Sequence, residues 1–176
     1  IVENLDQALD KGWIRTYYHR LYRIENKKIA AFECLARWID PARGMISPAE
    51  FIPTLLNYHL LYKLDLYMFE QVCQEVKVRH DHGLPLMPVS VNFSRQDFDH
   101  ADIAGEMDRI YDKYGMDEYV DKSYFIVEIT EQDIAVGAEG LREQLKRIRE
   151  NGYRLWLDDF GSGYSAINMF SQFEFD

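Results

Sequence analysis

Apolar and polar residues alternate along two neighbouring stretches near the start of the chain. Residues 13–24 and 28–38 are rich in tyrosine, isoleucine and other strand-forming residues, and Glu25-Asn26 between them is typical of a turn. Alternation with a period of two indicates strands that turn one face toward a core. The pattern therefore predicts a β-hairpin as the first part of a sheet.

Beyond the hairpin, helical and strand patterns follow one another. Ser47-Pro48-Ala49-Glu50 combines a capping serine, a proline at the first helical position and an acidic residue, which predicts a helix to about residue 57. A longer helix over 61–80 would present Leu64, Met68, Val72 and Val76 on one face. The remaining expected elements are helices at 4–11, 102–114, 138–151 and 165–172, and short strands at 87–93, 124–129 and 154–157.

This order of elements predicts the fold class. After the initial hairpin, strands alternate with helices, which favours an α/β protein with a parallel sheet or barrel and helices outside it. Ser94-Arg95-Gln96-Asp97, directly after the third strand, has the form of a capping box and predicts a further helical segment there.

Composition limits the classes of partner. The chain has 176 residues, of which 47% are apolar and 28% charged, so it is globular and long enough for one domain with a sizeable core. The formal net charge of −10 argues against a nucleic-acid polymer, because a phosphate backbone needs a basic surface. A small anionic ligand held through a cation remains compatible with this charge.

Cysteine content and hydropathy indicate the compartment. Cys34 and Cys73 have no metal-type spacing and are too few for a disulfide framework, which suits a reducing cytosol. The sequence contains neither a signal peptide nor an apolar run of membrane-spanning length. We therefore expect a cytoplasmic segment without membrane contact, and a first residue that is not methionine suggests a piece of a longer protein.

The fifth expected strand ends in two adjacent carboxylates, Asp158 and Asp159, followed by a glycine-spaced turn at Gly161 and Gly163. Two neighbouring carboxylates repel each other unless a cation or water lies between them. One interpretation is a cation site. The other is a turn in which Asp159 caps the next helix, and this stretch alone does not decide between them.

Oxygen-bearing side chains recur late on, or at the ends of, four of the expected strands. Parallel strands gather these positions on one face of a sheet or barrel. A set of carboxylate and amide oxygens without histidine or cysteine suits Mg²⁺ or Mn²⁺, and such ions serve phosphate chemistry. The set comprises Glu33, Asn92, Glu128, Asp158 and Asp159.

Each member also has a structural interpretation. Asn92 with Ser94 can form a strand-end turn, and for Asn92 taken singly this is the better interpretation. Glu33 and Glu128 can be outward-facing residues of half-exposed strands, although a buried carboxylate without a partner is costly. Arg37 lies on the same side of its strand as Glu33, where it can form a salt bridge to Glu33 or bind a phosphate.

Several blocks together resemble a known family, the EAL domain of cyclic di-GMP phosphodiesterases. They occur in the family's order over nearly the whole chain. The blocks are Glu33-Cys34-Leu35-Ala36-Arg37-Trp38, Ser47-Pro48-Ala49-Glu50-Phe51-Ile52-Pro53, Val91-Asn92-Phe93-Ser94, Glu128-Ile129-Thr130-Glu131 and Asp158-Asp159-Phe160-Gly161-Ser162-Gly163-Tyr164-Ser165.

The resemblance implies a modified (β/α)₈ TIM barrel whose first strand is antiparallel. About five of the eight strands are expected in this chain, so residues 1–176 would form the N-terminal two-thirds of an EAL domain. An open sheet leaves bare edges and uncovered apolar surface. We therefore expect a second copy of the chain to cover the exposed edge in a homo-oligomer.

The resemblance also implies an activity and roles for particular residues. Family members hydrolyse cyclic di-GMP to linear pGpG with two Mg²⁺ or Mn²⁺ ions that activate a water, and they are commonly fused to sensory or diguanylate cyclase domains. By this resemblance Arg37 would hold a substrate phosphate, Leu35 would contact a guanine, and Glu131 would support the loop after Asp159. The metal ligands would be Glu33, Asn92, Glu128, Asp158 and Asp159, with Glu33 and Asp158 in catalytic positions.

The chain also departs from the family pattern. Cys34 replaces the usual alanine, on the face away from the site, and His19-Arg20 stands where the family has Gln-Pro. The lysine of the family's later K-I-D motif and the glutamate of its A-E-G-V-E motif have no counterpart here, so the fragment itself is expected to be inactive. A catalytically silent EAL domain that acts as a cyclic di-GMP receptor or interaction module is the alternative, and an unrelated Mg²⁺-dependent α/β enzyme is a third.

Overall fold

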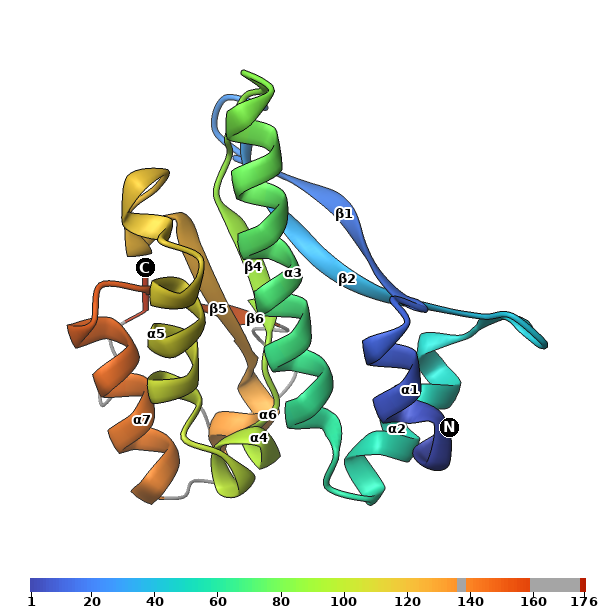
Figure 1. The fold of residues 1–176 in the computed structure, drawn as a ribbon. Helices are drawn as coiled ribbons and strands as arrows, with labels where there is room; N and C mark the ends of the chain where they lie inside the picture. Colours follow the sequence, from blue (N-terminus) through green and yellow to red (C-terminus); the bar gives the residue numbers. More distant parts are fainter. Residues whose placement is uncertain (136–138, 159–174) are drawn as a thin grey trace.

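A computed structural model describes residues 1–135, 139–158 and 175–176 of the chain (Figure 1). The six strands in this part form one sheet, in which β1 is antiparallel to β2 and the strands β2, β4, β5 and β6 are mutually parallel. The expected α/β class and antiparallel first strand are therefore confirmed. In sheet order the strands are β1 (Ile14–Tyr22), β2 (Ile29–Asp40), β4 (Val89–Asn92), β5 (Phe125–Thr130) and β6 (Arg154–Asp158), with β3 (Gly44–Ile46) paired to β2.

The helices agree with the expected positions to within a few residues. Ser47 caps the second helix as predicted, because its Oγ accepts a hydrogen bond from the backbone N–H of Ala49 at 3.3 Å. The predicted helix at 165–172 lies outside the described residues. The α-helices are α1 (Leu5–Asp10), α2 (Pro48–Asn57), α3 (Leu61–Asp81), α4 (Arg95–His100), α5 (Ile103–Lys113), α6 (Glu131–Ala135) and α7 (Glu139–Glu150), and three single 3₁₀ turns are η1 (Val2–Asn4), η2 (Met116–Glu118) and η3 (Lys122–Tyr124).

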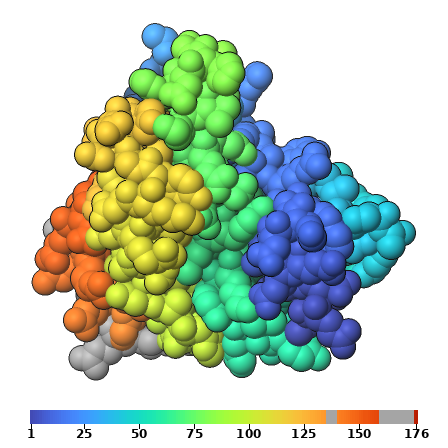
Figure 2. All heavy atoms as spheres, viewed as in Figure 1, coloured from blue at the N-terminus to red at the C-terminus, as the bar shows by residue number. Residues whose placement is uncertain are grey.

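The helices α3, α5 and α7 pack against one face of the sheet and make up most of the side of the molecule seen in Figure 2. The predicted apolar stripe of α3 is buried: none of its four members is more than 3% exposed. In β5 the residues Phe125, Val127 and Ile129 join this core, whereas Glu128 between them does not. The alternation of side chains along each strand therefore leaves the other face of the sheet to a different set of residues.

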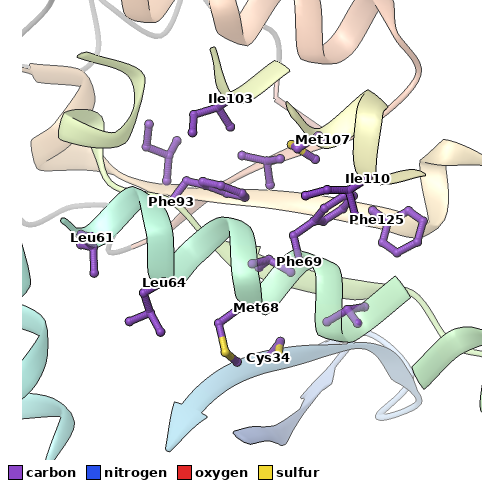
Figure 3. Packing of buried hydrophobic residues seen from close by; sticks show 14 of the residues in the cluster. Cys34, Leu61, Leu64, Met68, Phe69, Phe93, Ile103, Met107, Ile110 and Phe125 are labelled. Atoms are coloured by element: carbon purple, nitrogen blue, oxygen red, sulfur yellow. The ribbon is translucent and has the colours of Figure 1, made fainter. Parts of the chain in front are cut away.

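An aromatic cluster fixes α3 on the sheet. Phe69 of α3 is fully buried, with its ring centroid 5.1 Å from that of Phe125 in β5 and 6.2 Å from that of Tyr153. Figure 3 shows Phe69 beside Phe125, with Met68 of the same helix pointing toward Cys34 of β2. Edge-to-face aromatic contacts of this kind are stabilising beyond the area they bury. One helix thus spans β2 and β5, the two strands that carry the candidate glutamates.

The turn that follows β4 is fixed by the predicted capping box. The backbone N–H of Ser94 donates to Asp97 Oδ2 at 2.6 Å, and Ser94 Oγ accepts from the backbone N–H of Gln96 at 3.3 Å. These bonds start α4 three residues after Asn92. The chain therefore leaves the sheet directly after Asn92, the last residue of β4.

Among the described strands and α-helices, two short elements were not expected, β3 and α6. The first has three residues and the second five, so neither is long enough to produce a periodic hydrophobic pattern. Within the described residues, no helix combines the length and the apolarity needed to cross a bilayer.

Replacing Phe69 by alanine tests the role of the aromatic cluster. We expect Phe69→Ala to lower the free energy of unfolding by about 3–5 kcal/mol, because it removes a fully buried ring and leaves a cavity. Val78→Ala, on an exposed part of the same helix, should change it by less than about 0.5 kcal/mol. Urea denaturation followed by circular dichroism measures both, and equal effects of the two variants would contradict the packing described.

Candidate functional site

The candidate polar side chains lie on the face of the sheet opposite the helix layer. The parallel register pairs Glu33 with Ser90 and Asn92 with Glu128, and one strand further it pairs Thr130 with Asp158. Residues paired in this way point to the same side of a sheet. Four of the five oxygen-bearing residues expected from the sequence are thereby brought to one face, and the fifth, Asp159, lies outside the described residues.

Glu33 contacts side chains of both neighbouring strands, β1 and β4. Its Oε1 accepts a hydrogen bond from Asn92 Nδ2 at 3.2 Å, which links β2 to β4 across the face. Its other oxygen, Oε2, is 3.7 Å from Nδ1 of His19 in β1. The carboxylate side chain is 20% exposed, so it is shielded but still within reach of a ligand.

Glu128 is buried, with an unsatisfied oxygen. The residue is 8% exposed, and its Oε2 has no hydrogen-bond partner among the described residues. Burial, assisted by the negative charges of Glu33 and Asp158, raises the pKa of Glu128 to about 7, although a hydrogen bond with the Ser90 side chain opposes the rise. A buried carboxylate in this state is stabilised by a proton or by a cation.

Asp158 and Glu131 complete the acidic set. Asp158 is the last residue of β6 and half-buried, and its charge acts on Glu128. Glu131 begins α6 directly after β5 and is 2% exposed. Both therefore lie where the parallel strands end, which is where α/β proteins build their sites.

Arg37 and Leu35 continue along β2 on the same side as Glu33. Arg37 Nη1 donates to the carbonyl oxygen of Ala36 at 2.8 Å, and its guanidinium carbon is 5.7 Å from the ring centroid of Tyr17. The salt bridge between Arg37 and Glu33 that the sequence allowed is not formed. Among the described residues Arg37 thus has no carboxylate partner, and its guanidinium group can bind an anionic ligand on this face.

The chemistry of the face suits a hard cation. Its donors are carboxylate and amide oxygens, one oxygen of Glu128 has no hydrogen-bond partner among the described residues, and the charges of Glu33 and Asp158 act on this carboxyl. Among residues 1–135, 139–158 and 175–176, however, no group of three or more His, Cys, Asp or Glu side chains is close enough to form a complete metal site. The described residues could thus supply part of a coordination sphere.

The model of the EAL domain family matches residues 2–176 of this chain. The chain belongs to the EAL domain family. The expected resemblance is thereby confirmed over nearly its whole length.

Related proteins are considerably longer than this chain. The uncharacterised protein y4lL of Sinorhizobium fredii is 34% identical over 173 residues, covering 98% of the chain and 20% of that protein. MucR of Pseudomonas aeruginosa, named a bifunctional diguanylate cyclase/cyclic di-GMP phosphodiesterase, is 25% identical over 95% of the chain and 24% of its own length. NbdA of the same organism, named a cyclic di-GMP phosphodiesterase, is 26% identical over 94% of the chain and 21% of its own length. The chain spans about a fifth to a quarter of each.

Solved EAL structures have the same fold. The phosphodiesterase of MucR in complex with cyclic di-GMP superposes with a TM-score of 0.85 at 23% identity, covering 99% of this chain and 69% of that one. The FimX EAL domain of Pseudomonas aeruginosa, also bound to cyclic di-GMP, gives a TM-score of 0.82 at 14% identity over 99% and 68% of the two chains. The barrel-like architecture expected from the sequence is that of EAL domains.

Sequence reasoning did not single out two polar residues on this face of the EAL domain. Ser90 is fully buried, and its side chain lowers the pKa of Glu128 by hydrogen bonding. It lies two residues before Asn92, so the period of two along β4 could have identified it. His19 was noted only as a departure from the family pattern, and its contact with Glu33 depends on the hairpin register. Cys34 points to the helix side, as expected.

The raised pKa of Glu128 predicts how stability depends on pH in metal-free protein. Because the folded-state pKa of about 7 lies above the ordinary value of 4.5, this carboxyl contributes stability that is complete below pH 4.5 and is lost as pH rises toward 7. The Glu128→Gln variant has no ionisable carboxyl at this position, so it does not lose this stability as pH rises. At pH 8 in EDTA we expect the variant to be more stable than the wild type by about 1–2 kcal/mol, with the difference vanishing near pH 5.

Urea denaturation at pH 5, 6, 7 and 8 measures this difference. Glu150→Gln, at an exposed position of α7, is the matched control and should show no pH-dependent gain. Equal free energies of unfolding for the wild type and Glu128→Gln at pH 8 would contradict this prediction. They would show that the charged carboxylate of Glu128 is stabilised without a metal ion.

Proposed function

We propose that this chain forms part of a cyclic di-GMP phosphodiesterase domain that hydrolyses cyclic di-GMP to linear pGpG with Mg²⁺ or Mn²⁺. The observation that carries the proposal is the gathering of Glu33, Asn92, Glu128 and Asp158 on one sheet face, with an unpartnered buried oxygen on Glu128. Membership of the EAL family and the activities for which MucR and NbdA are named support it.

In this proposal the metal ligands are the four residues just named and Asp159. A divalent ion bound there would neutralise phosphate charge and lower the pKa of a water molecule. Glu33 and Asn92 are already joined at 3.2 Å, so their positions are set before any ligand arrives. Glu128 would have to be deprotonated to hold the ion, so the affinity for metal should rise as pH increases through about 7.

The remaining expected residues have positioning roles in this proposal. Arg37 binds a phosphate oxygen of the substrate through its guanidinium group, and Leu35 on the same side of β2 packs against a guanine. Glu131, buried at the start of α6, supports the segment after Asp159. The attacking water would add its oxygen to phosphorus while the bond from phosphorus to the 3′ ribose oxygen breaks. One proton of the water ends on this released oxygen, which leaves a 5′-phosphate and a free 3′-hydroxyl.

The proposal concerns the intact protein. By the family resemblance, the lysine of the K-I-D motif and the glutamate of the A-E-G-V-E motif complete the active site of EAL phosphodiesterases. With Mg²⁺ or Mn²⁺ the intact protein should release pGpG from cyclic di-GMP, and EDTA should abolish this. Glu33→Gln should lower kcat/KM by at least about 100-fold, because it removes a charged metal ligand. Chromatography of the products measures both effects.

Glu25→Ala, in the exposed hairpin turn, is the control and should retain full activity. Folded, metal-replete protein that yields no pGpG would contradict the proposed enzyme. If that protein bound cyclic di-GMP tightly, the receptor function would take its place.

We also propose that the chain self-associates through a sheet edge. In the described sheet β1 pairs only with β2, and a free strand edge is a template for pairing with another chain. The outer edge of β6 is less available, because the backbone N–H of Leu155 donates to Asp176 Oδ2 at 3.0 Å and its carbonyl oxygen accepts from the backbone N–H of Asp176 at 2.9 Å. Light scattering of the purified 176-residue chain should give twice its mass of 20.9 kDa. A sharp monomer peak at all concentrations would rule out this association.

A further inference from the structure

Two arginines lie directly opposite each other on the first two strands. In the antiparallel pair of β1 and β2, Arg15 is the register partner of Arg37, just as Tyr17 is the partner of Leu35 and His19 the partner of Glu33. Partners in such a pair have their side chains on the same face, a few ångströms apart. Arg15 therefore belongs to the same sheet face as Glu33, although nothing in its own sequence neighbourhood marks it.

Like charges directly opposite each other destabilise a sheet. Four other arginines of this acidic chain are paired with carboxylates in the described residues, among them Arg147 with Asp102 at 2.9 Å and Arg43 with Glu50 at 2.8 Å. Within residues 1–135, 139–158 and 175–176, neither Arg15 nor Arg37 has an ion-pair partner. A chain with a net charge of −10 thus leaves two opposed guanidinium groups without a counter-charge.

The position of the pair suits a ligand that also reaches the metal ligands. Arg37 is four residues beyond Glu33 in β2, toward the end of the strand where the candidate site lies. Tyr17, next to Arg15 on the same face of β1, places its ring 5.7 Å from the guanidinium carbon of Arg37. This ring supports the Arg37 side chain by a cation–π contact, so one of the two guanidinium groups is already oriented.

We propose that Arg15 is a further substrate-positioning residue, which with Arg37 clamps one phosphodiester group of a cyclic dinucleotide. This inference rests on the proposed function. The phosphate supplies the anion that the opposed arginines lack, and each guanidinium can donate two hydrogen bonds to its oxygens. Ligand binding thereby converts a repulsive cross-strand pair into a bridged one.

Binding of cyclic di-GMP to the intact protein, measured by calorimetry in EDTA so that hydrolysis is blocked, tests the inference. Arg15→Ala should raise Kd roughly tenfold, the loss expected for one charge-assisted contact. Arg15→Lys keeps the charge without the planar fork and should raise Kd only about threefold. The matched control is Arg20→Ala, because Arg20 lies on the same strand but is paired with Phe32 and faces the other side. Its Kd should equal that of the wild type.

The free protein provides a readout that a purely structural role would not give. Because Arg15→Ala removes a like-charge contact, we expect it to raise the ligand-free Tm by about 1–2 °C while reducing the rise in Tm on adding cyclic di-GMP. A structural arginine would instead lower the ligand-free Tm. If Arg15→Ala does not fold, the Kd of Arg15→Lys decides the question in its place.

The outcomes separate this inference from the function on which it rests. Wild-type protein that binds cyclic di-GMP, with equal Kd values for Arg15→Ala and Arg20→Ala, would overturn the role of Arg15 and leave the proposed function standing. Wild-type protein that neither binds nor hydrolyses cyclic di-GMP would overturn the proposed function and this inference with it. A selective loss in Arg15→Ala supports the clamp.

Discussion

The parallel register of β2, β4, β5 and β6 is the constraint on which the rest of the structure depends. A shift of one residue in any of these strands would exchange its two faces, sending Glu33 or Glu128 into the helix layer and a valine or cysteine out of it. The buried stripe of α3 and the ring of Phe69 against Phe125 oppose such a shift, because they need the apolar positions of each strand on their side. Packing on one face thus determines the chemistry on the other.

Electrostatics explains why the polar face is costly without a ligand. Glu128 is held in a buried position where burial and two neighbouring carboxylates raise its pKa to about 7, and one of its oxygens has no partner among the described residues. On the same face of the sheet, Arg15 and Arg37 oppose each other without a counter-charge among the described residues. A cation at the acidic group and an anion at the basic pair would relieve both. A metal ion with a bound phosphodiester provides that combination. Binding of the proposed substrate would therefore remove the electrostatic cost of the ligand-free site.

Local patterns predicted the main elements because local interactions form them. The four apolar residues from Leu64 to Val76 fixed the face of α3, and Ser94 with Asp97 marked the start of α4 through a capping box that the structure contains. The elements β3 and α6 were missed because three or five residues cannot show a period. The contact of His19 with Glu33 and the pairing of Arg15 with Arg37 follow from the hairpin register, which the turn sequence alone does not fix. The expected role of Asp159 stays a prediction.

A crystal structure of the intact protein with Mn²⁺ and cyclic di-GMP, with the metal located by anomalous scattering, tests the central claim most directly. The account predicts manganese bound to oxygens of Glu33, Asn92, Glu128 and Asp158 at about 2.1 Å, with a phosphodiester oxygen of the nucleotide on the same ion. Manganese found elsewhere, or a nucleotide bound away from this face of the sheet, would contradict it.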